Sequence, residues 1–200
     1  MPPGDDAADV TYSYRPSAMG APRNFALGAN ALMWDAGRQF GQIQYRDIRR
    51  VRMSFRPMSV QTMRFRTEIW SEGAPKLVLI STSWKNMVDQ ERHDAPYTRF
   101  IVALHRHIAL AGGAARLDQG INVLLYWLGV VTFTVVSLSM AAMAVRGLQA
   151  RAWTGTAFVA VFLAFFLWWG GNYFRRNRPR HYSADALPED LMPKGETPGA

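Results

Sequence analysis

The sequence predicts an α+β fold in which a small sheet, closed by one amphipathic helix, is followed by a transmembrane α-helical hairpin. Three observations predict it. Residues 24–82 contain short segments of alternating apolar and polar side chains, which is typical of half-buried strands. Residues 97–108 repeat apolar side chains every three or four positions, which indicates one buried helix face. Residues 121–145 and 153–174 are free of charge and long enough to cross a membrane.

Composition limits the chemistry available to the chain. The 200 residues include 23 Lys and Arg against 15 Asp and Glu, and 20 of these cations are arginine. Because arginine suits phosphate and lipid headgroups, the formal charge of +8 leads us to expect an anionic partner. The absence of cysteine excludes disulfides, thiolate metal sites and cysteine nucleophiles.

The N-terminal segment "MPPGDDAADV" does not have the pattern of an export signal. It carries prolines and aspartates where such a signal has a basic region and then an apolar core. We therefore expect no cleavable signal here, and a flexible tail over residues 1–22.

Four segments of the next region have strand patterns. We expect a turn at Asp35–Arg38 and a bulge near Asp47, where the alternation slips by one residue. The predicted strand regions are Asn24–Trp34, Phe40–Phe55, Val60–Trp70 and Lys76–Thr82.

A closing helix follows, with Asp94 as a candidate cap and Gly112 at its end. Its predicted apolar face consists of Tyr97, Phe100, Ile101, Leu104 and Ile108.

Two motifs in this region carry a family resemblance. The segment "IQYRDIRRV" (Ile43–Val51) and the helix "YTRFIVALHRHI" (Tyr97–Ile108) resemble bacterial pleckstrin-homology-like (bPH-type) domains, several of which occur in small membrane proteins beside helical hairpins. The resemblance covers roughly residues 24–112. It implies a strongly bent antiparallel sheet of about seven strands plugged by the helix, and a binding or scaffolding role. The helix lacks the tryptophan of the eukaryotic phosphoinositide binders, and the first turn offers only Arg38, so inositol-lipid recognition is not implied.

The two uncharged runs predict membrane-spanning helices over residues 121–145 and 153–174. The longer has 25 residues, or roughly 37 Å of helix against a hydrocarbon core of about 30 Å. A buried core helix is the alternative, but such helices rarely stay uncharged for so long. The link between the runs is short, so we expect an antiparallel hairpin with both chain termini on one side.

Small residues line one face of each predicted span, and such faces let helix backbones approach closely in lipid. We expect the two faces to meet, with docking of one of them onto a partner's helix as the alternative. The faces consist of Thr134, Ser137, Ala141 and Ala144 on the first span, and Ala157, Ala160, Ala164 and Gly171 on the second.

Arginines near the span ends predict the orientation. Seven lie on the side of the termini and only Arg146 and Arg151 in the hairpin turn, so the positive-inside rule places both termini in the cytoplasm. The predicted location is the inner (cytoplasmic) membrane, with two spans. The expected membrane anchors are Arg175, Arg176, Arg178, Arg180, Trp168 and Trp169.

These elements divide the chain into four parts. The predicted boundaries are a flexible tail over residues 1–22, a cytoplasmic domain over residues 23–116, a transmembrane hairpin over residues 117–176 and a flexible tail over residues 177–200.

A set of strand arginines points away from the predicted core and forms the candidate binding face for lipid or a protein partner. A plain solvated surface, partly neutralised by Glu68 and Asp47, is the alternative. The predicted lipid- or partner-binding residues are Arg46, Arg50, Arg52, Arg64 and Arg66.

The sequence offers no catalytic constellation. His105 and His107 lie two apart on a helix, about 200° around its axis, so they cannot share a metal ion as residues four apart could. We therefore expect no catalytic, cofactor-binding or metal-binding residues, no cofactor and no enzyme activity.

The predicted function is that of a membrane-tethered binding or scaffolding domain that recognises anionic lipid headgroups or a protein partner. The alternative is an accessory subunit of a larger membrane complex, with the hairpin as its main contact surface. A nucleic-acid partner is not expected, because Tyr45 and Phe65 point away from the basic face and cannot stack on bases there.

Overall fold

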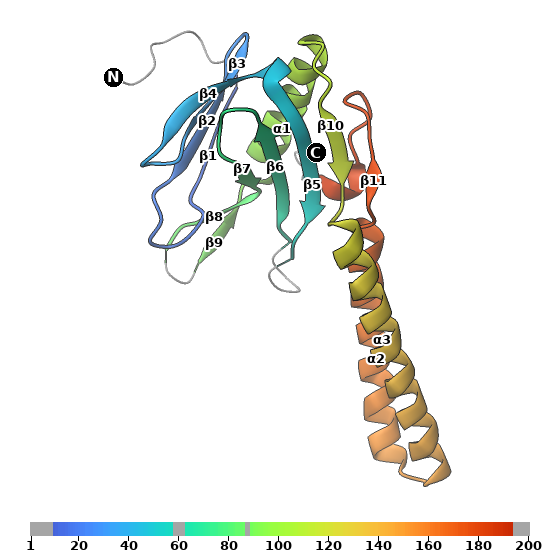
Figure 1. Cartoon of the computed structure of the whole chain (residues 1–200). Helices are drawn as coiled ribbons and strands as arrows, with labels where there is room; N and C mark the ends of the chain where they lie inside the picture. The colour runs from blue at the N-terminus through green and yellow to red at the C-terminus, as the bar shows by residue number, and fades with distance from the viewer. Residues whose placement is uncertain (1–9, 58–62, 87–88, 194–200) are drawn as a thin grey trace, which may run out of the picture. The chain divides into compact units, whose positions relative to one another are not determined.

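The computed structural model describes residues 10–57, 63–86 and 89–193, which fall into two compact units (Figure 1). The sheet unit comprises the chain up to Gln119 together with the segment that starts at Arg180. The hairpin unit comprises Gly120–Pro179. The chain is therefore an α+β protein whose sheet unit is discontinuous in sequence.

The first sheet is an antiparallel meander of four strands. The single strand region predicted over Asn24–Trp34 is two strands joined by a turn at residues 28–30, and the predicted turn after it is confirmed by Gly37, which has a φ of +84°. The strands are β1 (Val10–Tyr14), β2 (Arg23–Leu27), β3 (Ala31–Asp35) and β4 (Phe40–Gln44).

Strand β1 corrects the prediction of a flexible tail over residues 1–22. Tyr12 and Tyr14 are each 2% exposed, and their hydroxyls donate to the backbone carbonyls of Ile80 and Val78. Burial of two aromatic rings and these long-range hydrogen bonds hold the segment in the fold. Residues 1–9 of the predicted tail lie outside the described residues.

The second sheet has the order β11-β10-β5-β6-β7. All neighbours are antiparallel except β10 and β5, which run parallel. A separate two-stranded ribbon, β8 (Thr82–Trp84) with β9 (Gln90–Arg92), follows β7. The strands of the second sheet are β5 (Ile48–Phe55), β6 (Phe65–Ser71), β7 (Leu77–Ile80), β10 (Arg116–Gln119) and β11 (Arg180–His181).

The predicted strand region Phe40–Phe55 is divided between the two sheets. A 3₁₀ turn, η1 (Tyr45–Asp47), separates β4 from β5, and the register shift lies between Ile48 and Arg50, close to the bulge predicted near Asp47. The Tyr45 side chain is buried, and its hydroxyl donates to the carbonyl of Gly28 at 2.8 Å. This anchor explains why the chain changes sheets at this point.

Helix α1 (Asp94–Leu110) closes the sheet unit. All five predicted apolar residues are buried, and the rings of Tyr12 and Phe25 pack against Phe100 at 5.8 and 6.3 Å. Gly112, at a φ of +62°, follows the helix as predicted, but His93 rather than Asp94 occupies the N-cap position. The Tyr97 hydroxyl lies 2.6 Å from that of Thr67 on β6, so the helix contacts both sheets.

The segment after residue 177, predicted as a flexible tail, also belongs to the fold as far as residue 193. It contains β11 and a 3₁₀ turn, η2 (Glu189–Leu191), in which Leu191 is 1% exposed. The Tyr182 backbone N–H donates to the Leu117 carbonyl at 3.2 Å. Strand pairing and burial of an apolar side chain therefore correct the prediction for these residues, and residues 194–200 lie outside the described part.

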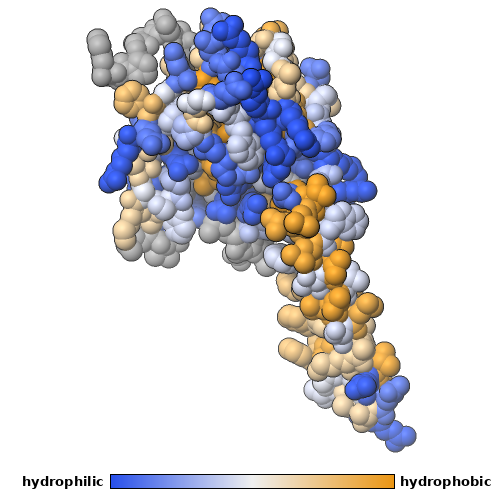
Figure 2. Space-filling model, in the orientation of Figure 1, coloured by the Kyte–Doolittle hydropathy of each residue, from blue (hydrophilic) through white to orange (hydrophobic). Residues whose placement is uncertain are grey.

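The hairpin unit consists of α2 (Val123–Gln149) and α3 (Trp153–Arg176), both long and apolar enough to cross a membrane. Figure 2 shows apolar side chains along this unit and hydrophilic ones at its turn. The Asn122 side chain caps α2 by accepting from the Leu124 N–H at 2.9 Å. Both helices extend beyond the predicted limits at their C-terminal ends.

The hairpin packs through aromatic rings on glycines rather than through two small-residue faces. A Cβ at Gly170 would lie 2.3 Å from the Phe133 ring, and one at Gly129 would lie 3.0 Å from the Phe174 ring. On α2, Ser137, Ala141 and Ala144 are partly buried, whereas Thr134 is exposed. On α3, all four predicted small residues, Ala157, Ala160, Ala164 and Gly171, are exposed. The prediction that the two faces meet is therefore wrong for α3, because its glycine and aromatic side face α2 instead.

Candidate functional site

Four of the five predicted arginines gather on one face of the second sheet. Arg50 and Arg52 lie on β5, Arg66 lies on β6, and Arg64 immediately precedes β6. Directly opposed residues share a face in a pleated sheet. The pairing of Arg50 with Trp70, and of Arg52 with Glu68, extends this face across β6, and Arg116 and Asp118 extend it across β10. Figure 2 shows hydrophilic side chains gathered over β5 and β10.

The fifth arginine, Arg46, does not belong to this face. It lies in η1, before β5 begins, with its side chain 71% exposed and its Nε 4.0 Å from an Asp47 oxygen. The 3₁₀ turn breaks the strand alternation that was used to place Arg46, so the prediction grouped it wrongly with the others.

A buried carboxylate, Asp118, organises one half of the face. It is 4% exposed, and it accepts from Arg50 Nε at 2.5 Å and from Arg116 Nε at 3.0 Å. His181 Nδ1 lies 2.6 Å from its Oδ1. Burial alone would raise the pKa of the Asp118 carboxyl, but the hydrogen bonds from Arg116 and Arg50 outweigh it and hold the pKa below its usual value. Arg50 and Arg116 are thus committed to an internal partner.

A second acid, Glu68, neutralises the middle of the face. It is also buried, and its Oε1 accepts from Arg66 Nη2 at 2.7 Å and from Lys76 Nζ at 3.1 Å. Trp70 lies on the same face. The cationic groups of Arg50, Arg52 and Lys76 lie 5.4 to 5.6 Å from the centroid of its ring. Such cation–π contacts order the cations over the sheet.

Several arginines lie close together toward the end of the face near Phe55. We call Arg52, Arg56 and Arg64 the arginine cluster. Burial lowers the pKa of Arg64, and the neighbouring charges of Arg66 and Arg56 lower it further. Burial, followed by the charge of Arg50, likewise lowers the pKa of Arg52. Like charges held this close favour binding of an anion, which would relieve their repulsion.

The backbone fixes the arginine cluster. The Arg56 N–H donates to the Arg64 carbonyl at 2.8 Å, which ties the two residues together where β5 leaves the sheet and β6 begins. The Arg56 Nε is buried and has no hydrogen-bond partner among the residues that the structure describes.

The predicted membrane anchors are divided between the two units. Trp168 and Trp169 are on α3, 65% and 38% exposed, and Arg175 and Arg176 form the last turn of that helix. Arg178 follows the helix, but Arg180 belongs to β11, where it pairs with Gln119. Their role as anchors stays a prediction.

Sequence reasoning missed a buried histidine contact. His105 Nδ1 lies 2.7 Å from the Ile101 carbonyl, and Nε2 lies 2.8 Å from the Tyr182 hydroxyl. Because a carbonyl only accepts, Nδ1 carries the proton and Nε2 accepts from Tyr182. Burial lowers the pKa of His105 and keeps the ring neutral. The apolar positions on either side of His105 in the helix were the signal that it is buried.

Among the described residues, no group of three or more potential metal-ligating side chains occurs. In comparisons with known proteins, no family model matches the chain, and neither a curated protein nor a solved structure matches it.

Proposed function

We propose that the chain is an integral protein of the inner (cytoplasmic) membrane whose sheet unit is a cytoplasmic, pleckstrin-homology-like binding domain for anionic groups. The hairpin holds this domain at the membrane surface. Its ligand is the anionic headgroup of a lipid, or an acidic surface of a protein partner. Catalysis has no part in the proposal.

The arginine cluster is the observation that carries the proposal. Burial and the charges of neighbouring arginines lower the pKa of Arg52 and of Arg64, and Arg56 is one of the neighbours of Arg64, so an anion bound here would offset their mutual repulsion. An anionic surface attracts each such cation by about 1 kcal/mol. The proposal therefore narrows the binding face to one end of the second sheet.

Chain connectivity supports a lipid surface as the ligand. Strand β10 runs parallel to β5 and ends at Gln119, opposite Met53, three residues before Arg56. Only three residues then separate Gln119 from α2. The sheet end with the arginine cluster is thus the end from which the chain continues to the first span.

The strand order supports the pleckstrin-homology-like interpretation. A meander of four strands is followed by three antiparallel strands and a helix that contacts both sheets. The length and apolar character of α2 and α3 support the membrane assignment, and the seven arginines outside the turn against two within it support cytoplasmic termini.

Vesicle capture tests the binding role. The full chain, held in zwitterionic nanodiscs, is expected to capture phosphatidylglycerol vesicles better than phosphatidylcholine vesicles, and less so in high salt. The triple variant Arg52→Gln, Arg56→Gln, Arg64→Gln should lose about a hundredfold in affinity, by roughly 1 kcal/mol for each arginine.

A charge-matched variant is the control. Arg38, Arg99 and Arg106 are exposed residues of the sheet unit outside the basic face, and their change to Gln removes the same net charge. This variant should retain capture. Equal loss in both triple variants, or capture unaffected by the first, would contradict the proposed site.

A second candidate function is that of an accessory subunit, favoured by the exposed small-residue face of α3. Ala157, Ala160 and Ala164 are exposed on α3, and exposed small residues on a span suit close approach of another helix. Under this hypothesis Ala160→Trp removes a membrane partner that co-purifies with the full chain, whereas Phe162→Trp does not. Co-purification that is insensitive to Ala160→Trp would contradict it.

A further inference from the structure

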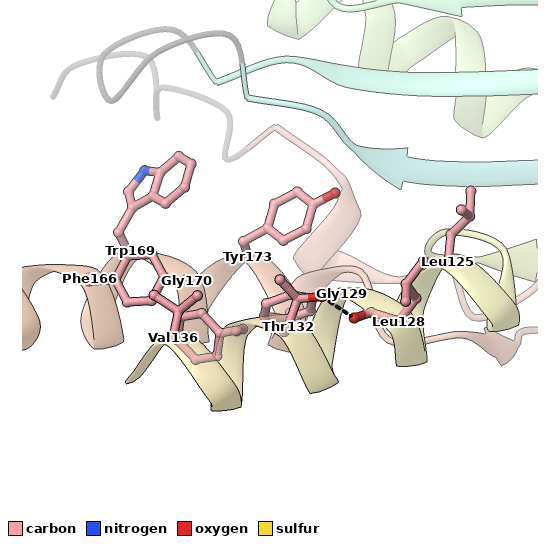
Figure 3. A pocket seen from close by; sticks show the side chains of 11 residues that line it. Leu125, Leu128, Gly129, Thr132, Val136, Phe166, Trp169, Gly170 and Tyr173 are labelled. Carbon is pink, nitrogen blue, oxygen red and sulfur yellow. Dashed lines mark hydrogen bonds between the residues drawn. The ribbon is translucent and has the colours of Figure 1, made fainter. Parts of the chain in front are cut away.

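A groove of about 510 Å³ lies between α2 and α3 (Figure 3). Its volume falls within the range of about 300–1,000 Å³ that is usual for small-ligand sites. The lining is almost entirely apolar and includes Leu125, Leu128, Thr132, Phe166, Trp169 and Tyr173.

The groove exists because the helices pack through rings on glycines. Gly129 and Gly170 add no side chain to it, and the rings of Phe174 and Phe133 lie against these glycines. Figure 3 shows Trp169, Tyr173 and Leu125 rising on the same side of the two helices. These larger side chains form walls around a floor of small residues.

The polar atoms of the lining are few, and the Thr132 hydroxyl is already satisfied. Its Oγ1 donates to the Leu128 carbonyl at 2.9 Å, which leaves its methyl group for contact with a ligand. A long apolar ligand therefore fits the groove better than a polar one, because a polar ligand would lose its hydrogen bonds to water.

A cation lies at one end of the groove. Trp169, Tyr173 and Arg176 follow one another at spacings of four and three residues, so they share one face of α3. Arg175 lies about 200° around the axis from Tyr173, on the exposed side of α3 that also carries Gly171. The apolar groove thus leads toward one guanidinium group in the last turn of the helix.

We propose that the groove holds one acyl chain of an anionic glycerophospholipid, with Arg176 binding its phosphate. The inference rests on the proposed function, since it requires α2 and α3 to lie in a bilayer. In a phospholipid the phosphate is followed by the apolar acyl chain. In the hairpin the cationic end of α3 is followed by the apolar groove, so the two match in order. Arginine suits the phosphate because its guanidinium can donate two parallel hydrogen bonds.

Native mass spectrometry of the full chain in mild detergent tests the site. After delipidation, added phosphatidylglycerol should bind as one tightly held copy, roughly fivefold better than phosphatidylcholine with the same acyl chains. Arg176→Gln should weaken phosphatidylglycerol retention roughly fivefold. Arg175→Gln, which removes the same charge from the opposite face of α3, should leave retention unchanged.

A second variant tests the groove itself. Thr132→Trp fills the floor and should abolish the tightly held lipid while Arg176 remains. Ser139→Trp is its control, because Ser139 is also an exposed hydroxyl residue of α2 that bonds its own helix, at Val135, but lies outside the groove. Circular dichroism verifies that both variants keep their helices, and the comparison of Arg176→Gln with Arg175→Gln decides the matter if Thr132→Trp does not fold.

Two results would overturn the inference: equal retention of the two lipids by the native chain, or equal retention of phosphatidylglycerol by the Arg176→Gln variant and the native chain. Extraction with alkaline carbonate separates this failure from that of the proposed function. A chain released by carbonate is not integral to the membrane, and the proposed function fails. A chain that resists carbonate but binds no preferred anionic lipid contradicts the groove alone.

Discussion

At the scale of single residues, Asp118 determines what the arginines around it can do. Without it, Arg50 and Arg116 would face solvent as two more cations, whereas with it both are held by a carboxylate that is 4% exposed. Breaking a buried ion pair by removing one member leaves the other without compensation. The carboxylate therefore stabilises the sheet and holds Arg50 and Arg116 in ion pairs.

Asp118→Asn is expected to lower the free energy of unfolding by about 2–3 kcal/mol. The amide keeps the shape of the carboxylate but loses its charge, and the partners are only partly buried, so the loss falls below the maximum for a buried pair. Chemical denaturation of the full chain in detergent micelles measures it. Glu91→Gln is the control, at an exposed carboxylate 3.8 Å from His93. It should change the free energy of unfolding by less than about 0.5 kcal/mol, as is usual for surface substitutions.

His105 gives the chain a predictable dependence on pH. Burial lowers its folded pKa below the ordinary value of 6.5, so the unfolded chain binds the proton more readily. Stability is then complete above about pH 6.5 and is lost as the pH falls from there toward the folded pKa, by at most about 1.4 kcal/mol per pH unit. Unfolding measured between pH 5 and 7.5 should show this slope, and His105→Gln should remove it.

His107→Gln is the control for that slope. His107 stacks on Tyr45 at 4.9 Å and is only partly buried, so its loss should leave the pH dependence in place. A slope that disappears with His107, or persists without His105, would contradict the assignment.

At the scale of elements, the hairpin depends on which side of α3 carries its glycines. Gly170 faces the Phe133 ring, and Gly171, the next residue, has open space around its Cβ position. Gly171 is therefore a suitable control for a substitution at Gly170, because the two residues are adjacent on one helix but only Gly170 faces a ring.

Gly170→Ala should destabilise the hairpin by about 1–3 kcal/mol, because the added methyl group would lie 2.3 Å from the Phe133 ring and force the helices apart. Gly171→Ala should leave stability unchanged or slightly raised, since alanine is the better helix former. Thermal unfolding in detergent micelles, followed by the helical circular dichroism signal, compares the two. Equal effects of the two changes would contradict the packing described here.

The elements with strong periodic patterns could be predicted, and those held by distant partners could not. The buried face of α1, from Tyr97 to Ile108, and both long helices follow directly from the spacing of apolar residues. Strand β1 has only two buried residues and follows a Pro- and Asp-rich segment, so its sequence pattern was too weak to predict a strand. Strands β10 and β11 together contain one apolar residue, Leu117. Their strand structure comes from pairing, of β10 with β5 and of β11 with β10.

The same distinction between local pattern and distant partner applies to the candidate site. Alternation along β5 and β6 correctly placed Arg50, Arg52, Arg64 and Arg66 on one face. It could not reveal Asp118, which lies more than sixty residues from Arg50 in sequence and reaches it only through the β10–β5 pairing. The sequence alone therefore did not distinguish Arg50, which pairs with Asp118, from the other arginines.

At the scale of the whole molecule, the absence of cysteine makes the proposed topology directly measurable. Single cysteines at Ser17, in the sheet unit, and at Gln149, beside the hairpin turn, should react with an impermeant maleimide from opposite sides of the membrane. Ser17→Cys should be labelled only in inverted vesicles and Gln149→Cys only in intact spheroplasts. A second sheet-unit position, Asp185→Cys, should follow Ser17, and labelling of all three from one side would contradict two spans.

The pairing of β10 with β11 also sets an order of events during synthesis. β10 precedes the hairpin unit and β11 follows it, so the sheet gains its last strand, and Leu191 its buried place, only after residues 120–179 have left the ribosome. At about 5–20 residues per second, that interval lasts roughly 3–12 s. During this time the sheet unit has an open edge at β10 and an unfilled place for Leu191 in its core. An open strand edge can pair with other chains. A pause in the synthesis of residues 120–179 would therefore prolong the exposure of an incomplete sheet to aggregation.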